Sequence, residues 1–133
     1  MSSNDKYYLE SEFNQFILNE NTEGKFSILH VNICSLDKNL DNLFILLQSV
    51  KYKFSFLAIC ETWETNSNVD IVQIPGYVKV SSPRLSGVGG GVALFIEHEI
   101  NFKVRNDLIL DDGIVDKSCE CILLRYIRQR SSK

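Results

Sequence analysis

Apolar and polar side chains are segregated along this chain, and residues 53–63 combine a continuous apolar run with an acidic end. Between Phe54 and Cys60 the one polar side chain is Ser55, and Glu61 follows directly. A short apolar run with aromatic and β-branched members predicts a strand in the interior of a sheet. Glu61 would then lie at the sheet rim, where α/β proteins place their sites and where a metal would bind. Alternatively, Glu61 only marks the solvated end of the strand.

A second apolar run, residues 26–32, predicts another strand that ends on a polar side chain, Asn32. Its apolar residues fall on both faces, which predicts a central position in the sheet. Between the two runs, leucines at spacings of three and four predict a helix that Ser35 or Asp37 can cap. Strand, helix and strand in this order predict a parallel pair, so Asn32 and Glu61 would emerge at neighbouring strand ends. Alternatively, Asn32 is a turn residue that caps its own backbone.

The flanking segments predict a leader and further strands. Residues 6–19 carry apolar side chains at helical spacing, which indicates a short amphipathic helix or a loosely packed leader. The expected organisation is a leader (1–24), one domain (25–127) and a basic tail (128–133). Further strands are predicted at residues 69–74, 77–82, 92–96, 101–105 and 119–126, with a turn at 111–113.

Several glycines, among them Gly89, Gly90 and Gly91, precede the apolar run 92–96. A phosphate-binding loop does not fit, because the Gly-Lys-Ser/Thr ending is missing and a strand follows where a helix should begin. The glycines are therefore expected to allow backbone conformations closed to other residues, or the close approach of a partner strand.

The composition is that of a globular protein with one domain: 133 residues, 44% hydrophobic and 23% charged. A net charge of −3 argues against a protein that coats nucleic acid non-specifically, although a local basic patch is enough for a catalytic DNA site. The spacing of Cys34, Cys60, Cys119 and Cys121 matches no zinc site, and reduced thiols are expected. We find no signal-peptide pattern and no apolar run long enough for a membrane span, and so expect an intracellular protein.

Four pieces of sequence carry a resemblance to a known domain. They are LHVNICSL (29–36), FLAICETW (56–63), IPGY (74–77) and RLSGVGGGVALFI (84–96). In this order they resemble the apurinic-type endonuclease domain of non-LTR retrotransposons of the jockey/CR1 kind, within the endonuclease/exonuclease/phosphatase superfamily. The resemblance covers about residues 25–125.

The resemblance implies an α/β fold, a sandwich of two mixed β-sheets flanked by helices, here truncated at the C-terminus. It also implies hydrolysis of DNA phosphodiester bonds with Mg²⁺ or Mn²⁺, which nicks target DNA for retrotransposition. By resemblance, Glu61 is the metal ligand and a catalytic residue, and Asn32 is a catalytic residue that positions the phosphate or the acidic cluster. Arg84 would bind a substrate phosphate, with a solvated loop arginine as the alternative.

The later motifs of that family, Gly-Asp-Phe-Asn and Ser-Asp-His, do not occur in these 133 residues, and neither His30 nor His98 stands where the family histidine would. Weak or absent metal binding and little or no nicking by this chain alone are therefore expected. The alternatives are a non-catalytic remnant or binding fragment, and a fragment of a superfamily phosphatase. DNA is the expected partner, and no membrane association is expected. Exposed sheet edges would allow self-association. If the protein is functional, its expected location is the nucleus.

Overall fold

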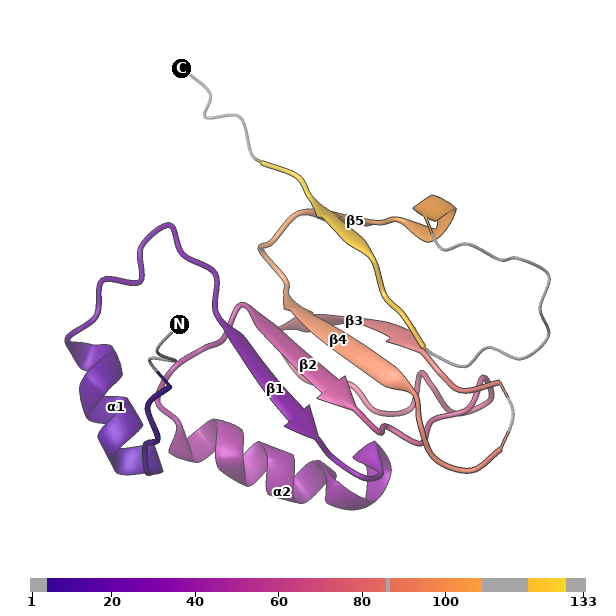
Figure 1. Ribbon diagram of the computed structural model, residues 1–133, viewed down its shortest axis with the longest axis horizontal. Helices are drawn as coiled ribbons and strands as arrows, with labels where there is room; N and C mark the ends of the chain where they lie inside the picture. Colours follow the sequence, from indigo (N-terminus) through magenta and orange to yellow (C-terminus); the bar gives the residue numbers. More distant parts are fainter. Residues whose placement is uncertain (1–4, 86, 109–119, 129–133) are drawn as a thin grey trace.

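A computed structural model describes residues 5–85, 87–108 and 120–128. The fold is mixed α/β, with a small mixed sheet, as the sequence predicts at this level (Figure 1). In chain order the elements are α1 (Glu10–Leu18), β1 (Ile28–Asn32), α2 (Leu36–Ser49), β2 (Phe56–Cys60), β3 (Tyr77–Ser82), β4 (Val92–Glu97), β5 (Phe102–Val104), the 3-10 helix η1 (Asn106–Leu108) and β6 (Leu124–Tyr126).

Four strands form the main sheet in the order β1-β2-β4-β3. β1 and β2 are parallel, with Asn32 opposite Cys60, whereas β4 is antiparallel to both β2 and β3. The predicted parallel pair and the interior position of β2 are therefore confirmed. The predicted central position of β1 is wrong, because β1 is an edge strand. Its side chains alternate between exposed and half-buried, and Ile28 is 64% exposed.

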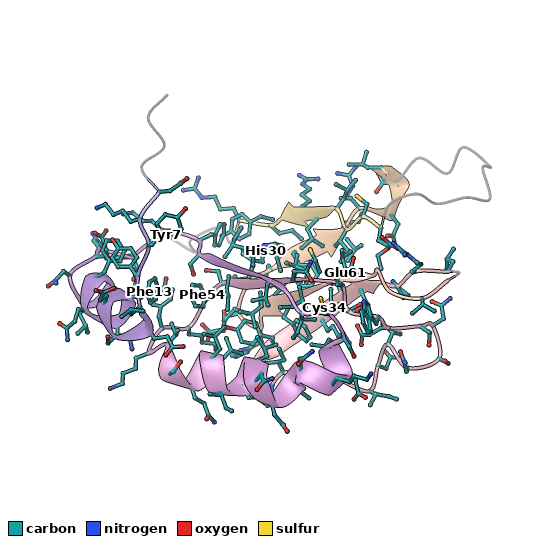
Figure 2. The ribbon with its side chains drawn as sticks, turned by 60° about the horizontal axis from the view of Figure 1, so that its bottom comes forward. Tyr7, Phe13, His30, Cys34, Phe54 and Glu61 are labelled. Carbon is teal, nitrogen blue, oxygen red and sulfur yellow. The ribbon has the colours of Figure 1, made fainter. Side chains whose placement is uncertain are left out.

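The leader contains a helix that packs on the domain. Asn14 of α1 donates from Nδ2 to the carbonyl of Ser49 at 2.9 Å, and its Oδ1 accepts from the Lys51 N–H at 2.8 Å. The ring of Phe13 stacks on that of Phe54 with centroids 6.0 Å apart (Figure 2). The predicted helix is confirmed, and these contacts join it to the domain although none of its residues is buried.

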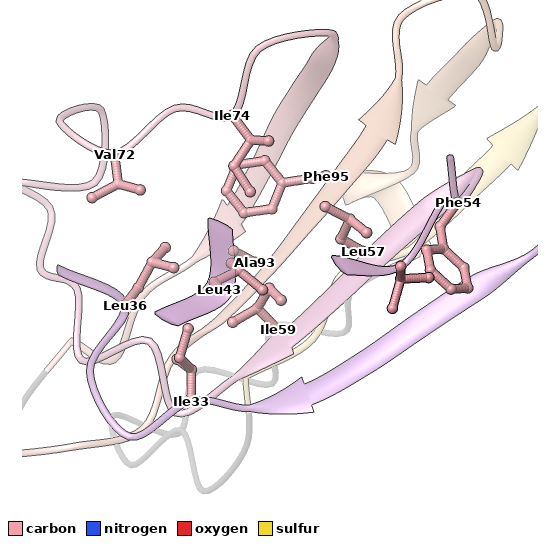
Figure 3. Packing of buried hydrophobic residues seen from close by; sticks show 11 residues of the cluster. Ile33, Leu36, Leu43, Phe54, Leu57, Ile59, Val72, Ile74, Ala93 and Phe95 are labelled. Carbon is pink, nitrogen blue, oxygen red and sulfur yellow. The ribbon is translucent and has the colours of Figure 1, made fainter. Parts of the chain in front are cut away.

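α2 covers one face of the main sheet (Figures 1 and 2), and Figure 3 shows the buried side chains that pack between them. The helix begins after Ser35, whose hydroxyl accepts a hydrogen bond from the Lys38 N–H at 3.4 Å, as predicted for a capping residue. Leu36 of α2, Leu57 of β2 and Phe95 of β4 are 0% exposed. Full burial of one such side chain stabilises the fold by about 1.5–3 kcal/mol, so these contacts fix the sheet against the helix.

The opposite face of the sheet lies beside a second, two-stranded sheet of β5 and β6 (Figure 1). The ring of Phe26 contacts both Phe56 of β2, at 5.5 Å between centroids, and Tyr126 of β6, at 5.0 Å. Ile96 is 0% exposed, and alternation along β4 turns it away from α2. The second sheet is antiparallel, whereas the sequence resemblance implies a mixed one.

The predicted strand at 69–74 is wrong, because this segment consists of turns and irregular backbone. The amine of Lys79 donates to the carbonyls of Val69 and Val72, at 2.6 and 3.0 Å, and so satisfies two carbonyls of this irregular segment. β6 is shorter than predicted, so Glu120 precedes it instead of lying in it. Cys119, the predicted turn at 111–113 and most of the predicted tail lie outside the described residues. In the described ranges, no helix is long and apolar enough to cross a membrane.

Candidate functional site

The carboxyl ends of β1 and β2 meet at one edge of the sheet, and the backbone there is strained. Four residues other than glycine have positive φ: Cys34 (48°), Ser35 (89°), Glu61 (56°) and Trp63 (57°). Side chains make this region unfavourable, and residues held in it cluster at functional sites. Cys34 and Glu61 lie together at this end of the sheet in Figure 2.

Backbone hydrogen bonds between three loops hold this rim in place. The loop after β1 bonds to the loop after β2, from the Ser35 N–H to the Glu61 carbonyl and from Leu36 to Thr62, both at 2.9 Å. The glycine loop before β4 lies on the other side. Its Gly90 carbonyl accepts from the Trp63 N–H at 2.9 Å, and the Gly91 carbonyl accepts from the Thr62 N–H at 3.2 Å. The segment 61–63 is thus fixed on both sides.

The Glu61 carboxylate has a defined orientation at this rim. Its Oε2 accepts hydrogen bonds from the Gly90 N–H at 3.0 Å and from the Trp63 indole Nε1 at 3.1 Å. The bond from Gly90 contributes most to lowering the pKa of Glu61, followed by the bond from Trp63. Oε1 has no hydrogen bond to any described residue. Glu61 is therefore an anchored anion with one open oxygen, which is more than the solvated end of a strand.

The glycines of the loop allow this close approach. Gly90 and Gly91 have φ of 70° and 83°. A Cβ on Gly91 would lie 2.6 Å from Oγ1 of buried Thr62, and a Cβ on Gly90 would overlap the guanidinium of Arg84. The prediction that the glycines allow backbone conformations closed to other residues is confirmed, whereas the close neighbours of Gly90 and Gly91 are the side chains of Arg84 and Thr62 and not a partner strand.

Arg84 lies over Gly90 and near Glu61, whose negative charge adds to the raised pKa of the guanidinium. The larger cause of that shift is Glu120, whose Oε1 accepts from Arg84 Nε at 2.9 Å. Nη1 donates to the Val88 carbonyl at 3.4 Å, and Nη2 has no hydrogen bond within the described part of the chain. Arg84 is thus a positioned cation and not a freely solvated loop side chain. The sequence patterns missed Glu120 as a site residue, since an ion pair across 36 positions leaves no spacing signal.

Asn32 lies at the neighbouring strand end but does not contact Glu61 among the described residues. Its exposed side chain accepts a hydrogen bond from the Cys34 thiol at 3.3 Å. This contact joins two side chains, so it is not the cap on its own backbone that the turn interpretation of Asn32 predicts. The structure thus brings the two strand ends together, while the amide and the carboxylate remain separate.

The two histidines make contacts away from the Glu61 carboxylate. His30 Nε2 lies 3.2 Å from the Cys60 thiol, on β1 and β2. His98 lies 3.2 Å from the Gly76 carbonyl and follows β4, which runs antiparallel to β2, so it is at the opposite edge of the sheet. Neither histidine has a hydrogen bond to Glu61 within the described part of the chain.

The residues present fit Mg²⁺ or Mn²⁺ as a site with a single carboxylate. Mg²⁺ binds through one or two carboxylates and keeps several waters, and the open Oε1 of Glu61 can provide one such ligand. No group of three or more His, Cys, Asp or Glu side chains suited to a metal exists in the described ranges.

Comparisons with protein-family models, with curated proteins and with solved structures find no match for this chain.

Proposed function

We propose that this chain is part of a metal-dependent DNA endonuclease domain of the endonuclease/exonuclease/phosphatase superfamily, of the type found in non-LTR retrotransposons. The observation that carries the proposal is the Glu61 carboxylate at the rim of the main sheet. Two hydrogen bonds fix its Oε2 and leave Oε1 open. A solvated strand end would need neither these bonds nor the left-handed backbone at Glu61.

In this proposal, Glu61 holds Mg²⁺ or Mn²⁺ through Oε1. The cation, when bound, polarises the phosphate and stabilises the leaving oxygen. Arg84 donates from Nη2 to a phosphate oxygen, while its bond to Glu120 fixes the plane of the guanidinium. Asn32, at the neighbouring strand end, contacts the phosphate from the other side once its bond to the Cys34 thiol opens.

Little or no nicking is expected from these 133 residues alone. Activation of water by a general base contributes about 10²- to 10⁴-fold in rate, and no described His, Asp or Glu joins Glu61 as such a base or as a second metal ligand. The Gly-Asp-Phe-Asn and Ser-Asp-His sequences that would provide these groups are not part of the chain. The same observation favours a second candidate function, a fragment that binds DNA without cutting it.

Titration with Mn²⁺, followed by calorimetry, tests the metal site. Glu61→Gln keeps the shape of the side chain and removes its charge, and is expected to weaken Mn²⁺ binding about tenfold or more. Glu99→Gln is the matched control, because Glu99 is exposed and follows β4 at the opposite edge of the sheet. Equal affinities of the wild type and Glu61→Gln would remove Glu61 from the metal site and defeat the proposal.

Two DNA assays separate the candidate functions. Incubation with supercoiled plasmid and Mg²⁺ is expected to give no efficient nicking. If the wild type nicks the plasmid efficiently and Glu61→Gln does not, the expected inactivity of the fragment is refuted. A gel-shift assay with duplex DNA is expected to show binding that weakens in Arg84→Ala. Sequencing the transcript beyond Lys133 adds an independent test, since a continuation into the two later motifs is what an endonuclease requires.

A further inference from the structure

The one tryptophan of the chain, Trp63, lies at the rim beside the Glu61 carboxylate. Its indole Nε1 donates to Glu61 Oε2 at 3.1 Å, and its backbone N–H donates to the Gly90 carbonyl at 2.9 Å. A Cβ on Gly89 would lie 3.4 Å from Nε1, so the glycine loop runs directly along this edge of the ring. Together with the left-handed backbone at Trp63, these contacts fix the direction of the side chain.

Trp63 is 40% exposed, although its ring is large and apolar. The one polar atom of the ring, Nε1, is already bonded to Glu61, so the ring has no free hydrogen-bond donor and offers π surface to a ligand. Two more apolar side chains of this rim, Leu85 and Val88 of the loop before β4, are 62% and 91% exposed. An aromatic ring that several contacts hold outside the hydrophobic core is suited to stacking on a flat ligand, because little side-chain freedom is lost on binding.

The charged groups beside the ring suit a phosphate. Because Nε1 lies against Oε2 of Glu61, the edge of the indole flanks the open Oε1 of the same carboxylate, the proposed position of the metal. Arg84 lies over Gly90 at the same rim, and its Nη2 has no hydrogen bond within the described part of the chain. A guanidinium binds a phosphate through parallel N–H donors. A π surface next to a cation that binds phosphate is the combination with which proteins hold single-stranded nucleic acid.

We infer that Trp63 stacks on a nucleobase next to the phosphate held at Glu61 and Arg84. The inference rests on the proposed function and deepens it, because it names the side chain that contacts the base, whereas Glu61 and Arg84 concern the phosphate alone. Stacking on the indole requires a base that is unpaired or displaced from its partner, so the preferred DNA is single-stranded or locally opened at this site. Every base has a π face, so Trp63 adds affinity without selecting a sequence.

Two labelled hexamers of equal charge test the inference in the full chain with Mg²⁺ present. One is a thymidylate hexamer, and the other carries a tetrahydrofuran in place of each nucleoside, so it keeps the phosphates and has no bases. Trp63 is the sole tryptophan, so its fluorescence reports directly on stacking. The thymidylate hexamer should quench this fluorescence saturably, and the abasic hexamer should not. Fluorescence anisotropy should show that the thymidylate hexamer binds about tenfold more tightly, since one stacked base contributes about that factor.

Two variants separate the ring from its hydrogen bond. Trp63→Phe and Trp63→Leu both lose the indole N–H and its bond to Glu61, but Trp63→Phe keeps an aromatic ring. Trp63→Phe should retain most of the preference for the thymidylate hexamer, and Trp63→Leu should bind both hexamers equally. Tyr7→Leu is the matched control, because Tyr7 is an aromatic side chain 94% exposed that lies well away from Glu61 (Figure 2), and it should leave the preference unchanged. Circular dichroism establishes that each variant folds.

Equal binding of the two hexamers by the wild type would overturn the inference, and so would a preference that persists in Trp63→Leu. Either result leaves the proposed function intact, because the Mn²⁺ titration of Glu61→Gln involves no base. A base preference that depends on Trp63, together with equal Mn²⁺ affinities of the wild type and Glu61→Gln, would support the stacking and defeat the metal site. The wild-type comparison of the two hexamers decides the matter even where Trp63→Leu fails to fold.

Discussion

Gly91→Ala tests whether close packing of the glycine loop holds the Glu61 rim. Gly91 has φ of 83°, and an added Cβ would lie 2.6 Å from Thr62 Oγ1. Thr62 is 2% exposed and its own N–H donates to the Gly91 carbonyl. The methyl group therefore meets a short, buried side chain whose backbone is bonded to Gly91 itself.

The expected loss of stability has two parts. A left-handed conformation costs a residue with a Cβ about 1–2 kcal/mol relative to glycine. Overpacking in a buried contact costs about 1–3 kcal/mol more, so the free energy of unfolding should fall by about 2–5 kcal/mol. Gly87→Ala is the matched control. Gly87 has φ of 84° in the same loop, and nothing lies within 4 Å of its Cβ position, so only the first cost applies.

Urea unfolding, followed by far-ultraviolet circular dichroism, measures both variants. Gly91→Ala should unfold at a clearly lower urea concentration than Gly87→Ala. Thr62→Ala removes Oγ1 and should recover part of the loss when combined with Gly91→Ala, although it is destabilising by itself. If Gly91→Ala lowers the free energy of unfolding no more than Gly87→Ala does, the contact between Gly91 and Thr62 does not hold the rim. The interpretation of the glycine loop as a close-packed support is then wrong.

Three further predictions concern the rim, the buried ion pair of Glu64 and Lys79 and the leader helix. The hydrogen bonds from Gly90 and Trp63 lower the native pKa of Glu61 below its ordinary 4.5, so they stabilise the fold above that pH and the contribution is lost as pH falls. Between pH 7 and pH 3 the urea midpoint should therefore drop less in Glu61→Gln than in the wild type. Lys79→Met leaves Glu64 buried and unpaired and should cost about 3–5 kcal/mol in urea unfolding. Glu64→Leu in the same chain should restore part of it, because the carbonyls of Val69 and Val72 still lack the Lys79 donor. Phe13→Ala should lower the free energy of unfolding by about 2 kcal/mol, because the ring is half-buried against Phe54. Tyr7→Ala, at a side chain 94% exposed, should change it by less than about 0.5 kcal/mol.

The local patterns were sufficient for the parallel pair and the helix between its strands. Few other arrangements fit the order of these patterns. The patterns are an apolar run that ends in Asn32, an amphipathic segment that starts with a serine, and a second apolar run that ends in Glu61. They also located the rim carboxylate. The position of β1 at the sheet edge could not be predicted in this way. It depends on whether a later strand pairs with β1 or with the other side of β2. That partner, β4, is contributed by residues 92–97.

The contacts that define the site connect residues far apart in sequence or use unexpected backbone. Glu61 and Trp63 meet because both have left-handed φ, which a sequence without glycine at these positions does not indicate. Glu120 was predicted to lie in a strand, at 119–126. The observed strand β6 begins only at Leu124, and Glu120 binds Arg84 from the irregular segment before it. The apolar residues at 69–74 suggested a strand, yet Val72 and Ile74 are buried against the core while Lys79 binds the carbonyls of Val69 and Val72. Hydrogen bonds from a lysine side chain seven and ten positions further along leave no signal within the segment itself.

The strain at the rim bears directly on what Glu61 can do. Positive φ at a residue other than glycine costs of the order of 1–3 kcal/mol, and the hydrogen bonds from the flanking loops return about 0.5–1.5 kcal/mol each. The conformation therefore persists only while both loops stay in place, and in return the direction of the Glu61 carboxylate is set before any ligand arrives. A fixed carboxylate loses less freedom on binding a cation than one on a solvated strand end. This advantage requires the glycine loop and the loop after β1 together, so a ligand of Glu61 and the packing of Gly91 should stabilise the same local structure.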